Sequence, residues 1–318
     1  MFSNITADKL VRSDHAYRKI EDLIDFKDLA KNLESCYSKN GAPGFPVEQG
    51  VRCLILQFME DYSDRQMEAA LQENVAVKWF CGFELGDGVP DYSYFSKLRK
   101  RLGTERIAEL FKNLNDFMEE EGLIGKCFSF VDSTAVITKT KLWDERDRAI
   151  EDGLKKLDNA TVKKYSADRD ARFGCKGKNK YWFGYKKHVC VDAKAGMITK
   201  VAMTPANESD ASGLEKVCPK SGMVMADKAY CGKQAQNTIK GNGCHSGAIQ
   251  KENMKEKNRD KDKWLTGIRM PFEGVFSKTR KRTRYRGIAK VQMQGFLESI
   301  AHNIKTYIKI QDRREARA

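Results

Sequence analysis

The sequence predicts a mixed α/β domain preceded by an all-helical region, and three observations lead to this fold class. Up to about residue 122, apolar side chains recur at helical spacing, and loops rich in Gly and Pro separate the helical stretches. From Lys126 onwards, apolar stretches of strand length alternate with helical ones, a pattern typical of a sheet with helices packed on it. Two of these strands also end in an aspartate. We therefore expect a helical domain at residues 1–122 and an α/β domain at residues 123–318.

The N-terminal region is expected to contain several short helices, of which a late one is basic. The apolar spacing predicts helices at residues 18–33, 47–60, 64–72, 91–102 and 105–121, and a helix or turn at residues 74–83. The helix at residues 91–102 carries four cations, Lys97, Arg99, Lys100 and Arg101. Short helices with a basic last member are typical of helix-turn-helix domains, so these cations are candidate DNA contacts. The alternative is a solvated helix face that binds nothing.

The α/β domain is expected to contain a sheet of short strands with helices between them. Strands are predicted at residues 128–134, 180–192, 197–204, 223–227 and 245–249, and helices at residues 209–217 and 233–240. A polar insertion at about residues 138–180 interrupts this order. Its first part, residues 141–165, is predicted to be helical, and its second part, residues 168–180, is basic and rich in Gly. A highly charged link at residues 250–259 leads to C-terminal helices.

Asp132 and Asp227 are the most informative charged residues because each follows an apolar strand directly. Residues 128–131 lead into Asp132, Ser133 and Thr134, and residues 223–226 lead into Asp227. If the two strands are neighbours, the two carboxylates lie side by side and repel each other unless a cation lies between them. Carboxylate oxygens are ligands that suit Mg²⁺ and Mn²⁺. The sequence therefore predicts a divalent-metal site at these strand ends.

The charge balance indicates an anionic partner. The 318 residues include 58 Lys and Arg against 44 Asp and Glu, a formal net charge of +14. This excess favours nucleic acid, and beside a metal site it favours a phosphodiester. No apolar run approaches the roughly 18 residues of a membrane helix, and the N-terminus lacks the cationic start and apolar core of a signal peptide. We therefore expect no membrane partner and a cytoplasmic location.

The thiols and imidazoles predict neither disulfides nor a zinc centre. The 9 Cys are scattered along the chain, and no two have the C-x-x-C spacing of zinc and redox motifs. The 4 His are equally dispersed, and His188 is a poor candidate ligand for a site built of oxygen donors. Reduced thiols in a cytosolic protein are the expected state.

Several motifs, in order along the chain, resemble one family. In the second half these are FVDST, GYKKH, TPANESD and ADKAY, at residues 130–134, 184–188, 204–210 and 226–230. In the first half, FPVEQGVRCLILQ, YSDRQMEAAL and VPDYSYFSKLRKRLG follow one another. Together they resemble the bacterial insertion-sequence-five group of DDE transposases, over roughly residues 13–307. Each motif alone is weak, whereas their common order is specific.

The resemblance implies a ribonuclease-H-like core with three metal-binding carboxylates. Asp132 and Asp227 match the first two positions, and Glu273 matches the third, on a helix after the last strand. The family's catalysis implies two Mg²⁺ ions, for which Mn²⁺ substitutes, about 3.5–4 Å apart. Asp132 would bind both ions, while Asp227 and Glu273 would bind one each. The location implied is bacterial and nucleoid-associated.

The assignment of the third acid rests on its neighbours. The family has an Arg shortly before the Glu and a basic residue after it, and Arg269 and Arg280 match these positions. Lys is usual where Arg280 stands. Thr266 occupies the position of an aromatic residue that often precedes the Arg. Because of this departure, Glu298 on the next helix remains the alternative to Glu273.

The activity implied is transposition. Such an enzyme binds the terminal inverted repeats of its element, cleaves the DNA with water to free a 3′ end, and joins that end to target DNA. Because two ends are joined, we expect a homodimer on double-stranded DNA. Two alternatives stay open: a domesticated DNA-binding regulator without catalysis, and a nuclease on the same core without strand transfer.

Basic residues near the acids are the further candidates for DNA binding. Tyr285, Trp143 and Trp182 could stack on unpaired bases, although core packing is the stronger explanation for Trp182 in its apolar strand. Each cation that contacts a phosphate releases counterions, so binding is expected to depend steeply on salt. The expected cationic contacts in this half of the chain are Lys186, Lys187, Arg269, Lys278, Arg280, Lys281, Arg282, Arg284 and Arg286.

Overall fold

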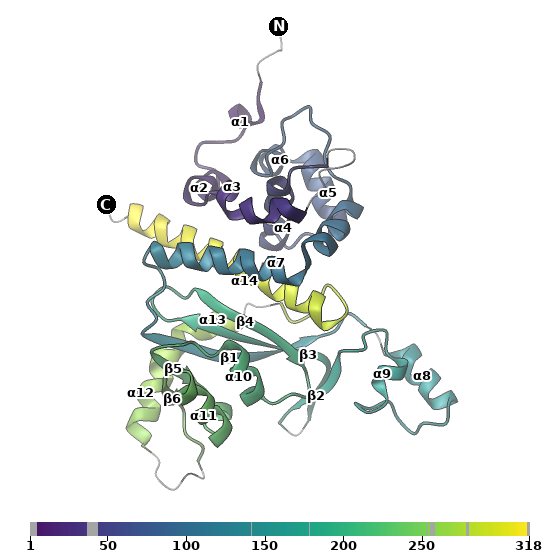
Figure 1. The fold of residues 1–318 in the computed structure, drawn as a ribbon, viewed down its shortest axis with the longest axis vertical. Coiled ribbons are helices and arrows are strands. Elements are labelled where there is room, and N and C mark those ends of the chain that lie inside the picture. The colour runs from purple at the N-terminus through teal and green to yellow at the C-terminus, as the bar shows by residue number, and fades with distance from the viewer. Residues whose placement is uncertain are drawn as a thin grey trace. The chain divides into compact units, whose positions relative to one another are not determined.

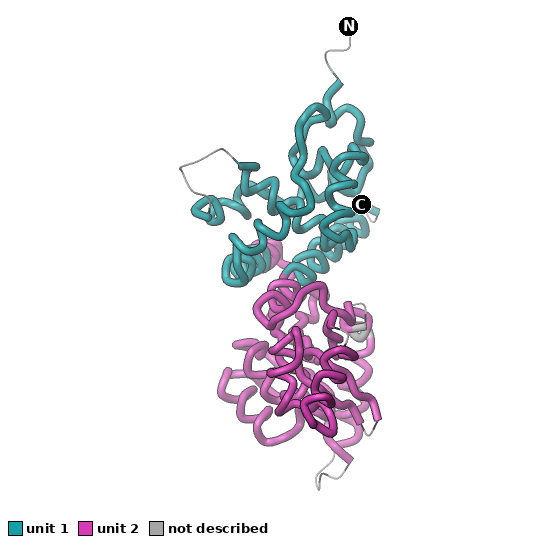
Figure 2. The backbone as a smooth tube through the Cα atoms, turned by 90° about the vertical axis from the view of Figure 1, so that its right-hand side faces the viewer, with its two compact units in different colours: residues 1–116, 297–318 teal, residues 117–296 magenta. Residues whose placement is uncertain are grey.

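The chain divides into two compact units in the computed structural model (Figure 2). One unit comprises Met1–Asp116 with Leu297–Ala318, and the other Phe117–Phe296. The structure describes residues 5–36, 44–140, 142–177, 179–252, 254, 258–277 and 280–316, without the side chains of Pro271, Glu273 and Ser277. In the part of the chain so described, no helix is long and apolar enough to cross a membrane.

The first unit is all-helical, as the sequence predicts. Its helices are α1 (Ala7–Leu10), α2 (Ala16–Leu23), α3 (Phe26–Ala30), η1 (Lys31–Cys36), α4 (Val47–Met59), α5 (Asp64–Glu73), α6 (Val75–Phe80), most of α7 (Tyr92–Glu120) and the end of α14 (Ile288–Glu315). Helix α4 is buried on nearly all sides, so it forms the centre of the unit. Ser63 caps α5: its side chain accepts from Gln66 N–H, and the Gln66 side chain accepts from Ser63 N–H.

Two helix boundaries in this unit differ from the prediction. The single helix expected at residues 18–33 is interrupted, because Ile24 and Asp25 are extended and Asp25 caps α3 by accepting from Asp28 N–H. The helices expected at residues 91–102 and 105–121 adjoin in α7, which bends at Gly103. The φ of Gly103 is 70°, a conformation that glycine adopts without a steric penalty.

The second unit is built on a mixed sheet (Figure 1). Its strands are β1 (Phe128–Ile137), β2 (Arg172–Lys176), β3 (Lys180–Asp192), β4 (Ile198–Pro205), β5 (Met223–Ala226) and β6 (His245–Ala248). The order is β2-β3-β1-β5-β6, with β4 also paired to β3. Strand β3 is antiparallel to β1, β2 and β4, whereas β1, β5 and β6 run parallel. This is the ribonuclease-H-like arrangement, so the predicted fold class is confirmed.

The insertion after β1 differs from its prediction. Only α8 (Trp143–Glu151) and α9 (Val162–Tyr165) form in the stretch expected to be helical. The basic, Gly-rich stretch forms β2, which pairs with the first half of β3. Gly174 allows this close packing, since a Cβ there would lie 2.6 Å from the Ala206 carbonyl oxygen. The sheet therefore has one strand more than predicted.

Helices cover both faces of the sheet. On one face lie α10 (Asp210–Val217) and α11 (Lys233–Gly241), which pack on a core that includes Val131, Val224 and Ala226 (Figure 1). On the other face, Phe272 from the turn η3 (Met270–Phe272) stacks on Phe130, with ring centroids 4.4 Å apart. Helix α12 (Arg259–Arg269) precedes that turn, and α13 (Glu273–Ser277) follows it. Consecutive residues of β1 thus contact opposite faces of the sheet.

Candidate active site

Asp132 and Asp227 are neighbours, as the sequence predicts. In the parallel pair of β1 and β5, Phe130 lies opposite Met225 and Val131 opposite Ala226. Asp132 and Asp227 directly follow Val131 and Ala226, so they adjoin the last pair of this register. Side chains that are opposite each other in parallel strands project from the same face of the sheet. The two carboxylates therefore project from the face of the sheet on which Phe272 stacks against Phe130.

Asp132 is held in place by two donors. Arg269 Nη2 donates to Oδ2 of Asp132 at 2.7 Å, and the backbone N–H of Ser133 donates to Oδ1 at 2.8 Å. The Asp132 side chain is 23% exposed. Burial raises the pKa of Asp132, and the Arg269 guanidinium and the Ser133 N–H oppose this rise while the charge of Asp227 adds to it. A cation beside the pair would relieve both the burial cost and the repulsion.

Asp227 is positioned by the turn that follows β5. Its Oδ1 accepts from the backbone N–H of Ala229 at 2.8 Å, and this bond caps the short helix η2 (Lys228–Tyr230). The residue is partly exposed, and it forms no ion pair with any residue that the structure describes. One carboxylate oxygen is thereby fixed by the backbone, and the group remains accessible to solvent.

The third acid is only partly placed. Glu273 begins α13, directly after Phe272, which stacks on Phe130 of β1. The side chain of Glu273 lies outside the described residues, so its role stays a prediction. Glu298 belongs to α14 and to the helical unit. Among the described side chains, no group of three or more His, Cys, Asp or Glu residues could hold a metal ion.

Three of the cations expected to bind DNA are buried or paired with groups of the protein itself. Arg99 is 8% exposed and pairs with Asp64, with Nη2 2.6 Å from Oδ2. Lys187 is buried, at 1% exposure. Lys186 donates from Nζ to Asp210 Oδ1 at 3.0 Å and to the Glu208 carbonyl oxygen at 2.7 Å. A contact with a DNA phosphate would compete with these surroundings, and the DNA-binding role of these three residues stays a prediction.

The basic segment after α13 is anchored to β1. Ile137 N–H donates to the Lys281 carbonyl oxygen at 2.8 Å, and Thr283 N–H donates to the Ile137 carbonyl oxygen at 2.9 Å. Arg282 thereby forms a parallel bridge with Ile137. Lys281, Arg282 and Arg286 are exposed, whereas Arg280 and Arg284 are partly buried. Lys278 lies outside the described residues. In the helical unit, Lys97, Lys100 and Arg101 are exposed on α7.

Other residues singled out in the sequence have structural surroundings. His188 is fully buried, its Nε2 is 2.9 Å from Thr204 Oγ1, and burial lowers its pKa to about 4. It lies opposite Ser133 on the face away from Asp132, as its register requires. Trp182 donates from Nε1 to the Tyr185 carbonyl oxygen at 3.1 Å, in agreement with a packing role. Trp143 is 65% exposed, with the Arg146 guanidinium 5.0 Å from its ring centroid.

Sequence reasoning assigned no role to Asp210. The Asp210 carboxylate contacts both Ser133, which follows Asp132, and Lys186. A signal was present, since Asp210 ends the TPANESD motif and follows Ser209, a residue suited to cap a helix. That local pattern does not predict the contacts of Asp210 with β1 and β3, which are distant from it in the sequence.

The fold and the pair of aspartates define a class: a ribonuclease-H-like protein with one carboxylate within β1 and a second directly after the adjacent parallel strand β5. Sequence comparison specifies the family. Residues 124–304 match the family described as "Transposase DDE domain", and residues 5–101 match "Transposase domain (DUF772)". The chain belongs to the DDE transposase family, and the resemblance carried by its motifs is confirmed. Transposases of this family are enzymes that cut and join DNA, and they generally use divalent metal ions.

Solved structures of transposases are more distant. A piggyBac transposase synaptic complex with hairpin DNA has a TM-score of 0.37 and 9% identity, and the match covers 95% of this chain and 73% of that one. A Mos1 transposase paired-end complex with the left transposon end has a TM-score of 0.18 and 9% identity, over 86% of this chain and 82% of that one. Scores this low do not establish a common fold.

Proposed function

We propose that this protein binds the terminal inverted repeats of a mobile element, cleaves phosphodiester bonds there, and joins the freed 3′ ends to target DNA. One observation supports the proposal most strongly: the register of β1 and β5 brings together Asp132, within β1, and Asp227, directly after β5. Two carboxylates so placed in a basic protein suit a divalent cation and a phosphodiester.

The residues present fit Mg²⁺ or Mn²⁺. The donors are carboxylate oxygens, and burial, with a smaller contribution from the charge of Asp227, raises the pKa of Asp132, a cost that a bound cation would offset. Asp132, Asp227 and Glu273 would hold the metal, with two ions at the site. Bound there, the metal would supply Lewis-acid stabilisation of the charge that develops on the phosphate oxygens. Arg269 holds the Asp132 carboxylate in a fixed orientation.

The reaction proceeds in two transfers that need no covalent bond to the protein. Water attacks the phosphodiester at the element's end, which leaves a 3′-OH on the element and a 5′-phosphate on the flanking strand. That 3′-OH then attacks a phosphodiester of the target, so a bond to the target forms as one within the target breaks. The protein's task in both transfers is to place the carboxylates and to orient the DNA.

The exposed cations provide two kinds of DNA contact. Lys281, Arg282 and Arg286 lie on the segment anchored to β1 and would hold the DNA backbone in the α/β unit. Lys97, Lys100 and Arg101 on α7 would contact the terminal repeat. A homodimer on DNA would supply one such set for each of the two ends that are joined.

One assay tests the proposal. Purified protein is incubated with Mg²⁺ and a DNA that carries the terminal inverted repeats of the source element, and the products are scored for nicking and for strand transfer. We expect both products, and a bound complex that contains two protomers by light scattering. Binding without nicking would instead establish a regulator, and nicking without strand transfer would establish a nuclease.

A further inference from the structure

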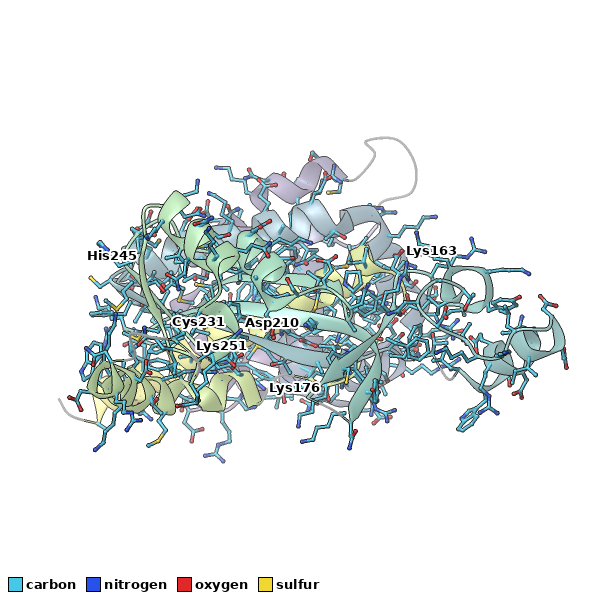
Figure 3. All side chains as sticks on the ribbon, turned by 90° about the horizontal axis from the view of Figure 1, so that it is seen from below. Lys163, Lys176, Asp210, Cys231, His245 and Lys251 are labelled. Atoms are coloured by element: carbon cyan, nitrogen blue, oxygen red, sulfur yellow. The ribbon has the colours of Figure 1, made fainter. Side chains whose placement is uncertain are left out.

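The carboxylate of Asp210 lies on the opposite face of the sheet from Asp132, and its contacts lead to the same candidate site. Asp210 is the first residue of α10, after the N-cap Ser209, whose side chain accepts from Ser212 N–H at 3.1 Å. Figure 3 labels Asp210 together with Cys231, the residue that follows η2. Helix α10 contacts η2, the turn that begins at Asp227. The helix that begins with Asp210 therefore contacts both β1, which carries Asp132, and the turn that begins at Asp227.

The contact with β1 leads directly to Asp132. Ser133 Oγ donates to Asp210 Oδ1 at 2.9 Å, and the backbone N–H of Ser133 donates to Asp132 Oδ1 at 2.8 Å. One residue thus contacts Asp210 with its side chain and Asp132 with its backbone. The orientation of the Asp132 carboxylate consequently depends on the position of the Ser133 peptide, which Asp210 helps to fix.

The same oxygen of Asp210 is bound to β3. Lys186 Nζ lies 3.0 Å from Asp210 Oδ1, and the two side chains are 15% and 25% exposed. Lys186 also donates to the Glu208 carbonyl oxygen, just ahead of α10. The charge of Asp210 is therefore matched within the protein, and its carboxylate is held between Ser133 of β1 and Lys186 of β3.

The turn after β5 lies within the electrostatic reach of the same carboxylate. Tyr230, three residues after Asp227, has no exposed surface. Burial raises the pKa of Tyr230, and the charges of Asp210 and Asp132 raise it further. Tyr230 belongs to η2, which contacts α10, so the turn after Asp227 packs against the helix that begins with Asp210.

The position of α10 is fixed by a close approach to β3. A Cβ on Gly213 would lie 2.1 Å from Cε1 of His188, so only glycine allows α10 to lie this near the strand. His188 is itself held through Nε2, 2.9 Å from Thr204 Oγ1 of β4. Asp210, three residues before Gly213 on the same helix, cannot move away from Ser133 without displacing this packed interface.

We propose that Asp210 is a positioning residue, which holds Ser133 and the turn after Asp227 so that the Asp132 and Asp227 carboxylates present their oxygens to one cation. This inference rests on the function proposed above. Asp210 itself touches neither the metal nor the DNA in this scheme. It acts through its bond to Ser133 and through the packing of α10 against η2.

Mn²⁺ affinity, measured by isothermal titration calorimetry on the full-length protein, gives a readout that does not depend on turnover. We expect Asp210→Ala to weaken Mn²⁺ binding by roughly tenfold, because groups that orient metal ligands typically contribute this much. Cleavage by this variant should recover in part at high Mn²⁺, which a general loss of structure would not permit. Asp210→Asn keeps an oxygen acceptor for Ser133 and should be less impaired. Glu215→Gln, on the exposed side of the same helix, is the matched control and should bind as the wild type does.

A second variant keeps the test decisive if Asp210→Ala fails to fold. Ser133→Ala removes the hydroxyl that Asp210 binds, so it should weaken Mn²⁺ binding in the same direction and by less. Folded Asp210→Ala and Ser133→Ala proteins with the wild-type Mn²⁺ affinity and metal dependence would overturn the inference alone. If instead Asp132→Asn binds Mn²⁺ as the wild type does, the proposed metal site is wrong, and the positioning role is overturned with it.

Discussion

The two faces of strand β1 use their carboxylates differently. Asp132 and Asp210 are almost equally exposed, at 23% and 25% of their side chains. On one face, Asp132 pairs with Arg269 and has a second carboxylate, Asp227, beside it. On the other face, Asp210 binds Lys186 and the Ser133 hydroxyl. Exposure and a paired cation are therefore common to Asp132 and Asp210, and the feature that distinguishes Asp132 is the second carboxylate beside it.

The largest expected effect concerns the face of Asp132. Asp132→Asn or Asp227→Asn should reduce DNA cleavage to below a few per cent of wild type, because an amide of the same shape cannot replace an anionic metal ligand. Binding to the element's end should remain nearly intact. Cleavage and gel-shift assays on the same preparations check both statements. Strong residual cleavage in both variants would show that these residues are not metal ligands. The contrast between the two faces of β1 would then no longer hold.

The second prediction asks which helix completes that face. Glu273→Gln should abolish cleavage as the Asp variants do, because Glu273 follows Phe272, which stacks on β1. Glu298→Gln, on α14, should leave cleavage largely intact. Single-turnover cleavage rates of the two variants decide between them. The reverse result would assign the third carboxylate to α14.

The third prediction concerns the stability of the other face. Gly213→Ala should lower the free energy of unfolding by about 1–3 kcal/mol or more, since the new Cβ would overlap the His188 ring. Gly267→Ala is the matched control, because no atom lies within 4 Å of its Cβ position, and it should be neutral or slightly stabilising. Urea denaturation measures both. In the His188→Ala background the cost of Gly213→Ala should shrink, and an unchanged cost would show that the two residues do not meet.

The fourth prediction concerns pH. The pKa of His188 falls from its usual 6.5 to about 4 because of burial, so between these values the unfolded chain binds more protons than the folded one. Stability should therefore decline as pH falls through this window, by up to about 3 kcal/mol from this residue. Urea midpoints of wild type and His188→Gln between pH 7 and pH 5 provide the measurement, with the variant showing a shallower decline. Parallel curves would place the acid sensitivity in other groups.

The smallest expected effect compares cations on and off the DNA-binding surface. Arg282→Ala should weaken binding to cognate and scrambled DNA alike, and reduce the slope of log affinity against log salt by about one unit. Lys186→Ala should leave that slope unchanged, since Lys186 is already paired with Asp210. Gel shifts over a salt series measure both slopes. Equal changes in the two variants would mean that Lys186 leaves its partner when DNA binds.

The sequence predicts what depends on neighbouring residues and misses what depends on distant partners. The sequence predicts the strands that lead into Asp132 and Asp227 because apolar runs and the charge that follows them are local features, whereas β1 continues past Asp132 to Ile137 because it pairs with β3. Strand β2 was missed because its formation depends on the edge that β3 offers. The sequence does not predict the ion pair of Arg99, because its partner Asp64 lies 35 residues away. A charge is visible in a sequence, whereas its neutralisation by a distant residue is a property of the fold.

The bridge between Ile137 and Arg282 fixes the distance along β1 between the basic segment and Asp132. Asp132 and Ile137 are separated by five residues of one strand, which at ~3.3 Å per residue spans roughly 17 Å. Successive base pairs of B-DNA are ~3.4 Å apart, so this length corresponds to about five base pairs. Under the proposed function, a duplex that lies along β1 would meet the Arg282 segment about five base pairs from a phosphate bound near Asp132.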